Sequence, residues 1–182
     1  AFAGWFDVKT SQMLTTDTRD HRALHQVLSM LAKTGVIPHA TPSLDATRQA
    51  TGIALREAVL AEVPAFSNSG NPEILPSLNV HIAEHIQEIR RLLSGGEVGD
   101  FEFVRTHAHR RAEQRFPLDA TLHAYRCGHR ILSRWLRDAA IATGPGSIER
   151  AVAAVADFAI EYTNTISTIV TSEYVFHTRV LA

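Results

Sequence analysis

The sequence predicts an all-α protein, a single-domain bundle of about six helices that ends in a long C-terminal helix. Apolar residues recur three and four positions apart through most of the 182 residues, which is the period of a helix that buries one face. No segment shows the apolar–polar alternation of a strand, and no internal repeat divides the chain. We therefore assign residues 1–16 to an N-terminal arm and residues 17–182 to one all-helical domain.

The composition is that of a globular domain without a polyanionic partner. The apolar fraction is 45%, and the net charge of −1 gives no general attraction to nucleic acid. The single cysteine, Cys127, excludes an internal disulfide and a cysteine-rich zinc site, and it fits a reducing compartment. No apolar run reaches the roughly 20 residues that span a bilayer, and the first residues lack the pattern of a signal peptide. We expect a cytoplasmic protein with no membrane partner.

The first half of the chain predicts three helices. They cover about residues 24–34, 42–63 and 74–94. Gly35 and the Gly95–Gly96 pair mark helix ends, since glycine readily adopts the left-handed conformation that follows a helix. Pro42 suits a first helical turn, and Pro64 ends the same helix. The segment SNSGNP, residues 67–72, has the composition of a loop.

The second half predicts three more helices. They cover about residues 101–115, 117–142 and 148–180. Thr143–Ser147, TGPGS, reads as the turn before the last helix, with Ser147 as its N-cap. At about 1.5 Å per residue the last helix exceeds 45 Å, which is longer than a small domain needs. We expect such a helix to continue as a connector or as a dimer contact.

The helix over residues 117–142 has an apolar face too broad for one partner helix, so we expect packing on two sides. Tyr125, His129 and Trp135 lie in this face, and we predict that they form a ligand pocket with Arg126 at its rim. The alternative is that the same side chains are satisfied core residues. Gly128 costs about 1 kcal/mol relative to alanine, which close approach of another helix would offset.

The opposite face of this helix is polar. Its arginines recur at helical spacing, and the wheel places Cys127 with them. These are Arg126, Arg130, Arg134 and Arg137. We interpret this face as solvated rather than as a phosphate-binding surface, because the overall charge balance is near neutral.

The sequence contains two pairs of histidines, and in each pair the two residues are one helical turn apart. His81, Glu84 and His85 match the H-x-x-E-H pattern of a zinc peptidase, in which both histidines bind zinc and the glutamate is the base. His21 and His25 form a second pair. We favour boundary residues of a buried stripe for His81 and His85, because a short pattern without its structural context is weak. For His21 and His25 we favour a polar helix flank. A metal-dependent hydrolase using His81, Glu84 and His85 remains an alternative.

No other catalytic pattern is present. The chain has no G-x-S-x-G elbow, no P-loop and no G-x-G-x-x-G sequence. Its carboxylates are not paired at a spacing that indicates acid–base chemistry. We predict no catalytic residue, no metal ligand and no cofactor, and hence a protein that is not an enzyme.

One block of sequence carries a resemblance to a known family. It contains Arg111-Ala112-Glu113-Gln114, Pro117-Leu118, Ala124-Tyr125-Arg126 and Gly128. With Glu62–Phe66 and the helix that ends at Gly95-Gly96, this order resembles the N-terminal regulatory domain of PucR/CdaR-type transcription factors, which is related to the N-terminal domain of RsbR-type regulators. The resemblance covers about residues 57–174. It departs at Arg115, where the family commonly has a glycine suited to a left-handed helix end.

The resemblance implies a globin-like, all-helical sensory domain of a bacterial transcriptional regulator. Its partner would be an unknown small-molecule effector or a protein, and DNA would be bound only by a C-terminal domain that is not in this chain. We expect a homodimer that uses the last helix around residues 162–174. A haem sensor with His129 or His85 as the axial ligand is the main alternative.

Overall fold

The computed structural model describes residues 21–142 and 148–181, which form seven helices and contain no strand. A first helix covers residues 21–33. The others are α2 (Ile37–Glu62), α3 (Pro64–Ser67), α4 (Ile74–Leu93), α5 (Glu102–Glu113), α6 (Leu118–Ile141) and α7 (Ile148–Leu181). The predicted all-α class and the long last helix are confirmed. The arm assigned to residues 1–16 and the turn at residues 143–147 lie outside the described residues.

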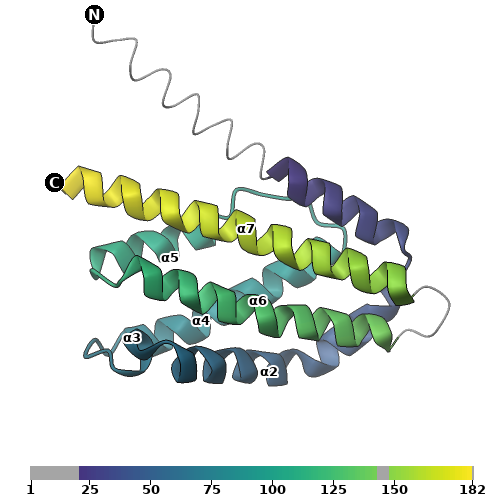
Figure 1. The fold of residues 1–182 in the computed structure, drawn as a ribbon, viewed down its shortest axis with the longest axis horizontal. Coiled ribbons are helices and arrows are strands. Elements are labelled where there is room, and N and C mark those ends of the chain that lie inside the picture. The colour runs from purple at the N-terminus through teal and green to yellow at the C-terminus, as the bar shows by residue number, and fades with distance from the viewer. Residues whose placement is uncertain (1–20, 143–147, 182) are drawn as a thin grey trace, which may run out of the picture.

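Helix α6 occupies the centre of the bundle. It packs against α2 on one side and α7 on the other, while α5 packs on α7 and α4 packs on α2 (Figure 1). This arrangement confirms that the broad apolar face of α6 has two partners. Gly128 lies where α6 approaches α2, and a Cβ built there would be 3.7 Å from Leu55 Cδ2.

Two apolar clusters form the core. The larger draws on every helix except α3, and Phe158 of α7 is fully buried within it. The smaller surrounds Phe66 and Phe116, whose ring centroids lie 4.7 Å apart. It packs the short helix α3 and the turn after α5 against one end of α4, and Cys127 of α6 completes it.

Two helices end in the same hydrogen-bonded turn. After α4, Gly95 has φ 91°, and the N–H of Gly96 donates to the carbonyl of Arg91 at 3.0 Å. After α5, Arg115 has φ 55°, and the N–H of Phe116 donates to the carbonyl of Arg111 at 2.9 Å. Both are Schellman turns. Arg115 therefore keeps the left-handed geometry that a glycine would adopt more easily.

The start of α2 differs from the prediction. The helix begins at Ile37 rather than at Pro42, with Pro38 in its first turn and Pro42 inside the helix. Pro38 is well placed there because the first N–H groups of a helix have no intrahelical partner. Pro42 removes one hydrogen bond. Burial of Ala40 and Leu44 on either side of Pro42 holds the extra turn in place.

Helix α7 contains 34 residues, which corresponds to about 51 Å at 1.5 Å per residue. One side is buried along most of this length, from Ala151 to Tyr174. None of the described helices combines the length and apolar character needed to cross a membrane.

Candidate functional site

A cavity of about 70 Å³ lies inside the bundle, between α2, α4, α5, α6 and α7. Its apolar wall comes mainly from leucine, valine and isoleucine. Its polar wall comprises His81, His85, His107, Thr121, Tyr125, His129, Tyr162 and Thr163. The volume admits a few water-sized molecules, whereas pockets for drug-sized ligands measure about 300–1,000 Å³.

Four of these side chains form a continuous hydrogen-bonded chain across three helices. The hydroxyl of Tyr125 on α6 lies 2.7 Å from Nε2 of His81 on α4. That nitrogen is also 2.9 Å from Nε2 of His85, one turn further along α4. Nδ1 of His85 lies 2.7 Å from the hydroxyl of Tyr162 on α7. The chain therefore joins α6, α4 and α7 through side chains alone.

One nitrogen among these hydrogen-bonded side chains has two partners but only one donor or acceptor site. Neutral imidazole carries either one proton or one lone pair on a given nitrogen. Nε2 of His81 faces both the Tyr125 hydroxyl and Nε2 of His85, so in either tautomer the two contacts share a single donor or acceptor site. Nδ1 of His85 has Tyr162 alone. The hydrogen bond to Tyr125 is therefore the weaker end of the chain.

The cluster is uncharged at neutral pH. Burial lowers the pKa of His81 to about 3, with a further contribution from Arg111. Burial, and next the neighbouring His81, hold the pKa of His85 well below its usual value. Burial raises the pKa of both Tyr125 and Tyr162 above the usual tyrosine range. A neutral molecule that exchanges hydrogen bonds suits this lining better than an ion does.

Aromatic contacts fix the histidine rings. The ring of His107 on α5 stacks on His81 with centroids 3.6 Å apart and planes 3° from parallel. Phe103, one turn earlier on α5, meets the ring of His85 edge to face at 5.0 Å. Burial is also the main reason that the pKa of His107 is lowered. Helix α5 thus forms part of the cavity wall through His107.

The structure brings together two of the four predicted ligand residues. Tyr125 and His129 both line the cavity. Nδ1 of His129 lies 2.9 Å from Oγ1 of Thr163 and 3.2 Å from the carbonyl oxygen of Ala159, both on α7. Both predicted residues therefore have partners across the helix interface while facing the cavity.

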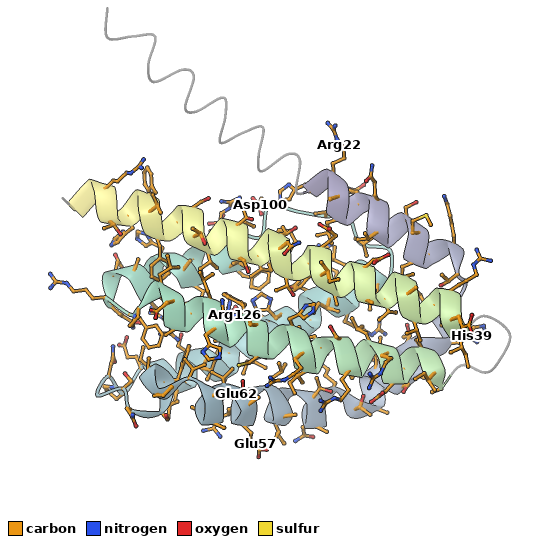
Figure 2. All side chains as sticks on the ribbon, viewed as in Figure 1. Arg22, His39, Glu57, Glu62, Asp100 and Arg126 are labelled. Atoms are coloured by element: carbon orange, nitrogen blue, oxygen red, sulfur yellow. The ribbon has the colours of Figure 1, made fainter. Side chains whose placement is uncertain are left out.

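The other two predicted residues lie elsewhere. Trp135 is buried against α2, where its Nε1–H donates to Oγ1 of Thr47 at 2.8 Å. Arg126, labelled in Figure 2, is exposed and lines a shallow groove between α6 and α7 with Ser167 and Thr171. Neither contributes to the cavity, because α6 turns them toward α2 and toward solvent.

Two predictions about polar side chains were wrong. His81 and His85 are buried, with 5% and 7% of their surface exposed, rather than at the edge of the stripe. Helix α4 is covered on more than one side, and this explains the difference. Cys127 is buried at 2% rather than on the solvated face, because the end of α2 covers that part of α6.

Sequence reasoning missed His107 and Tyr162 as members of the site. Tyr162 was expected only as part of a dimer contact, and it is buried within the bundle. His107 follows Phe103 by four residues, which places the two on one side of α5. This spacing indicates burial, but only the packing of α4 between α5 and α6 brings the rings together.

The alternative sites fit the geometry poorly. A haem needs a pocket of several hundred Å³, and both ring nitrogens of His85 already have hydrogen-bond partners. His81, Glu84 and His85 do not bring three ligand atoms together. Within residues 21–142 and 148–181, the group whose ligand atoms converge to within 4.8 Å is Glu62, His123 and Cys127.

Arg111 has a structural role. Its side chain is fully buried beside the rings of Phe66 and Phe116. It donates from Nη1 to Oε1 of Gln114 at 2.8 Å and from Nη2 to the carbonyl of Ile74 at 3.4 Å. The RAEQ block thereby ties the end of α5 to the start of α4.

Comparison with known proteins identifies a family. A family model described as the RsbT co-antagonist protein rsbRD N-terminal domain matches residues 49–182. No curated protein and no solved structure matches the chain. The matched region runs from the middle of α2 to the end of the chain, so it includes all the residues that line the cavity.

Proposed function

Because the chain belongs to the RsbT co-antagonist protein rsbRD N-terminal domain family, a family of regulatory N-terminal domains, we propose that it senses a ligand or a partner for a bacterial transcriptional regulator. DNA binding belongs, in this proposal, to a separate C-terminal domain of the PucR/CdaR type. The chain itself catalyses no reaction, and it acts in the cytoplasm.

The observation that carries this proposal is the polar cavity inside the bundle. Buried polar groups are costly unless they are paired, so a cluster of histidines and tyrosines is an expensive way to fill a core. Four such side chains form hydrogen bonds with one another beside the cavity of about 70 Å³: Tyr125, His81, His85 and Tyr162. A ligand with one donor and one acceptor could replace the weaker of these bonds.

The size of the cavity limits the effector. A molecule of a few non-hydrogen atoms fits the observed volume, and a larger one requires the helices to separate. In the second case the effector selects a more open packing, and its differential affinity for the two packings supplies the signal. The neutral lining favours an uncharged effector in both cases.

Helix α7 is the proposed output element. Tyr162 places it in the cavity wall, and the Tyr174 hydroxyl lies 3.0 Å from Oγ1 of Thr121 three turns further along. A shift of α6 relative to α7 at the cavity must therefore be accommodated along the length of α7. A domain that follows this helix would receive the displacement.

The proposed homodimer also involves α7, but through its outward face and not through the tyrosines at the two ends of the expected contact segment, residues 162–174. Tyr162 and Tyr174 are buried within the chain, at 3% and 6% exposure, so they are not free to contact a second copy. The outward side chains of the same segment include Ser167 and Thr171, and Phe176 just beyond is 62% exposed. Sedimentation equilibrium of wild type and Phe176→Ser tests this surface.

The sensing proposal is tested with two small probes and a matched pair of variants. Xenon requires only apolar room, and phenol adds one hydroxyl and requires the cavity to widen. Amide NMR spectra of the wild-type chain should show saturable changes with at least one probe, at residues of α4 and α6 and along α7. Gly128→Ala places a methyl group in the cavity wall and should weaken binding.

Gly52→Ala is the control. Gly52 is also a helical glycine, and its added Cβ would lie 3.6 Å from Ile86 Cδ1, but it borders a surface groove instead of the cavity. It should gain helix stability like Gly128→Ala, by up to about 1 kcal/mol, and bind the probes as wild type does. Binding that is absent in wild type, or equal in wild type and Gly128→Ala, would contradict the proposal.

A further inference from the structure

A second cluster of chemically distinctive side chains lies on the far side of α6 from α7. His123 and Cys127 stand four residues apart on α6, so their side chains project from the same face. Glu62, the last residue of α2, meets them there, and its position at the end of the helix is labelled in Figure 2. One ligand atom from each of the three residues lies within 4.8 Å of the other two.

We propose that Glu62, His123 and Cys127 bind one zinc ion or a similar thiophilic divalent cation. Sulfur, imidazole nitrogen and carboxylate oxygen are the three ligand types that zinc takes in proteins. Metal–ligand bonds of about 2.0–2.3 Å around a tetrahedral ion place the ligand atoms roughly 3.5 Å apart. Sγ of Cys127 and Oε2 of Glu62 are already 3.2 Å apart.

The surroundings keep the carboxylate in a position to bind the ion. Glu62 uses its two oxygens for different contacts, since Oε1 is paired with Arg130 and Oε2 accepts the hydrogen bond from the Cys127 thiol. An ion that takes Oε2 and Sγ leaves the Arg130 pair in place. Hydrogen bonds of this kind to a ligating carboxylate commonly orient it.

Charge and protons balance in the bound state. The Cys127 thiol releases its proton to water when its sulfur ligates the ion, so one thiolate and one carboxylate match the 2+ charge. His123 binds as the neutral imidazole. Three protein ligands leave a fourth position for water, and Glu62 is 37% exposed, so the site is open to solvent.

The site spans two helices, and metal binding would fasten the end of α2 to α6. Gly128 and Ala124, next to the proposed ligands on α6, both line the central cavity. The proposal stands independently of the sensing function, since it needs only the three ligand side chains.

Cobalt provides the direct test. The reduced chain, stripped with a chelator, is titrated with Co²⁺ while the near-ultraviolet thiolate-to-Co²⁺ charge-transfer band is recorded. Cys127 is the only cysteine, so this band reports its sulfur alone. We expect a saturable band at one equivalent that Zn²⁺ abolishes by displacement. Cys127→Ala should remove the band, and His123→Ala and Glu62→Gln should each weaken binding at least tenfold.

His39→Ala and Glu57→Gln are the matched controls. Both residues are exposed on α2 and are labelled in Figure 2, and both variants should bind Co²⁺ as wild type does. Because Cys127 is buried, circular dichroism checks whether Cys127→Ala still folds. If Cys127→Ala does not fold, the Co²⁺ affinities of the His123 and Glu62 variants test the proposal. A missing band, or wild-type affinity in both of these variants, overturns the proposal.

Discussion

Removing the hydroxyl of Tyr162 should destabilise the protein more than removing that of Tyr125, although each hydroxyl lies 2.7 Å from a histidine nitrogen. The reason lies in what each substitution leaves behind. Tyr162→Phe leaves Nδ1 of His85 without a hydrogen-bond partner. Tyr125→Phe leaves Nε2 of His81 with its second partner, Nε2 of His85, at 2.9 Å.

The magnitudes follow from this difference. A buried hydrogen bond contributes about 1 kcal/mol net, and a polar atom left buried without a partner costs about 1–3 kcal/mol. We therefore expect Tyr162→Phe to lower the free energy of unfolding by about 2–3 kcal/mol. Tyr125→Phe should cost about 1 kcal/mol or less, because it also removes the competition for a single nitrogen site.

Urea denaturation of the two variants and wild type, at one pH near neutrality, measures both values. Phenylalanine keeps the ring in each case, so packing around the cavity changes little. The double variant adds a second reading, because hydroxyls linked through a hydrogen-bonded histidine pair should not be additive. Equal losses of unfolding free energy in the two variants, or a larger loss for Tyr125→Phe, would refute the assignment of the hydrogen bonds from Tyr125 to Tyr162.

Three further predictions concern pH, a helix end and the solvated face. The pKa values of His81, His85 and His107 are lowered in the native state, so below about pH 6.5 these histidines bind protons only in the unfolded chain. Unfolding free energy should thus fall by up to about 4 kcal/mol between about pH 7.5 and about pH 5.5, which urea titrations at the two pH values would detect. Arg115→Gly should raise the free energy of unfolding by about 0.5–1 kcal/mol, and with it the melting temperature, because the left-handed conformation costs an arginine about 1–2 kcal/mol. Glycine avoids this cost, but its greater conformational entropy in the unfolded state offsets part of the gain. Arg134→Ala should change the free energy of unfolding by less than about 0.5 kcal/mol in thermal or urea denaturation, since Arg134 is exposed, and a large loss would show that this face is not solvated.

The helices were predictable because their signals are local. Periodic apolar residues located the helix from residue 117 to residue 142 to within a residue at each end, and Gly95 marked the end of α4 through its left-handed backbone. The start of α2 was not predicted, since Pro38 and Pro42 are both suitable for a first turn. Burial of Ala40 and Leu44 decided between them, and burial depends on the other helices.

The candidate sites depend on contacts that a helical wheel does not contain. The wheel places Cys127 beside the arginines of α6, and it does so correctly as an angle around that helix. The end of α2 covers this particular position, so Cys127 is buried while Arg130 one turn away stays exposed. The spacing of His123 and Cys127 was visible in the sequence, but the third proposed metal ligand, Glu62, comes from 65 residues before Cys127.

The hydrogen-bonded chain in the cavity also suggests where a proposed effector would act first. Tyr162 holds His85 through an unshared bond, whereas Tyr125 shares Nε2 of His81 with His85. A neutral ligand that enters beside Tyr125 needs to replace only the weaker interaction, and the rest of the chain can remain intact. The ligand would therefore loosen α6 from α4 before it disturbs the contact between α4 and α7. A hydroxyl-bearing probe such as phenol would insert between Tyr125 and His81 and bond both, so Tyr125→Phe removes one of its two partners. On this argument Tyr125→Phe weakens phenol binding but leaves xenon binding unchanged, and the same reduction with both probes would contradict it.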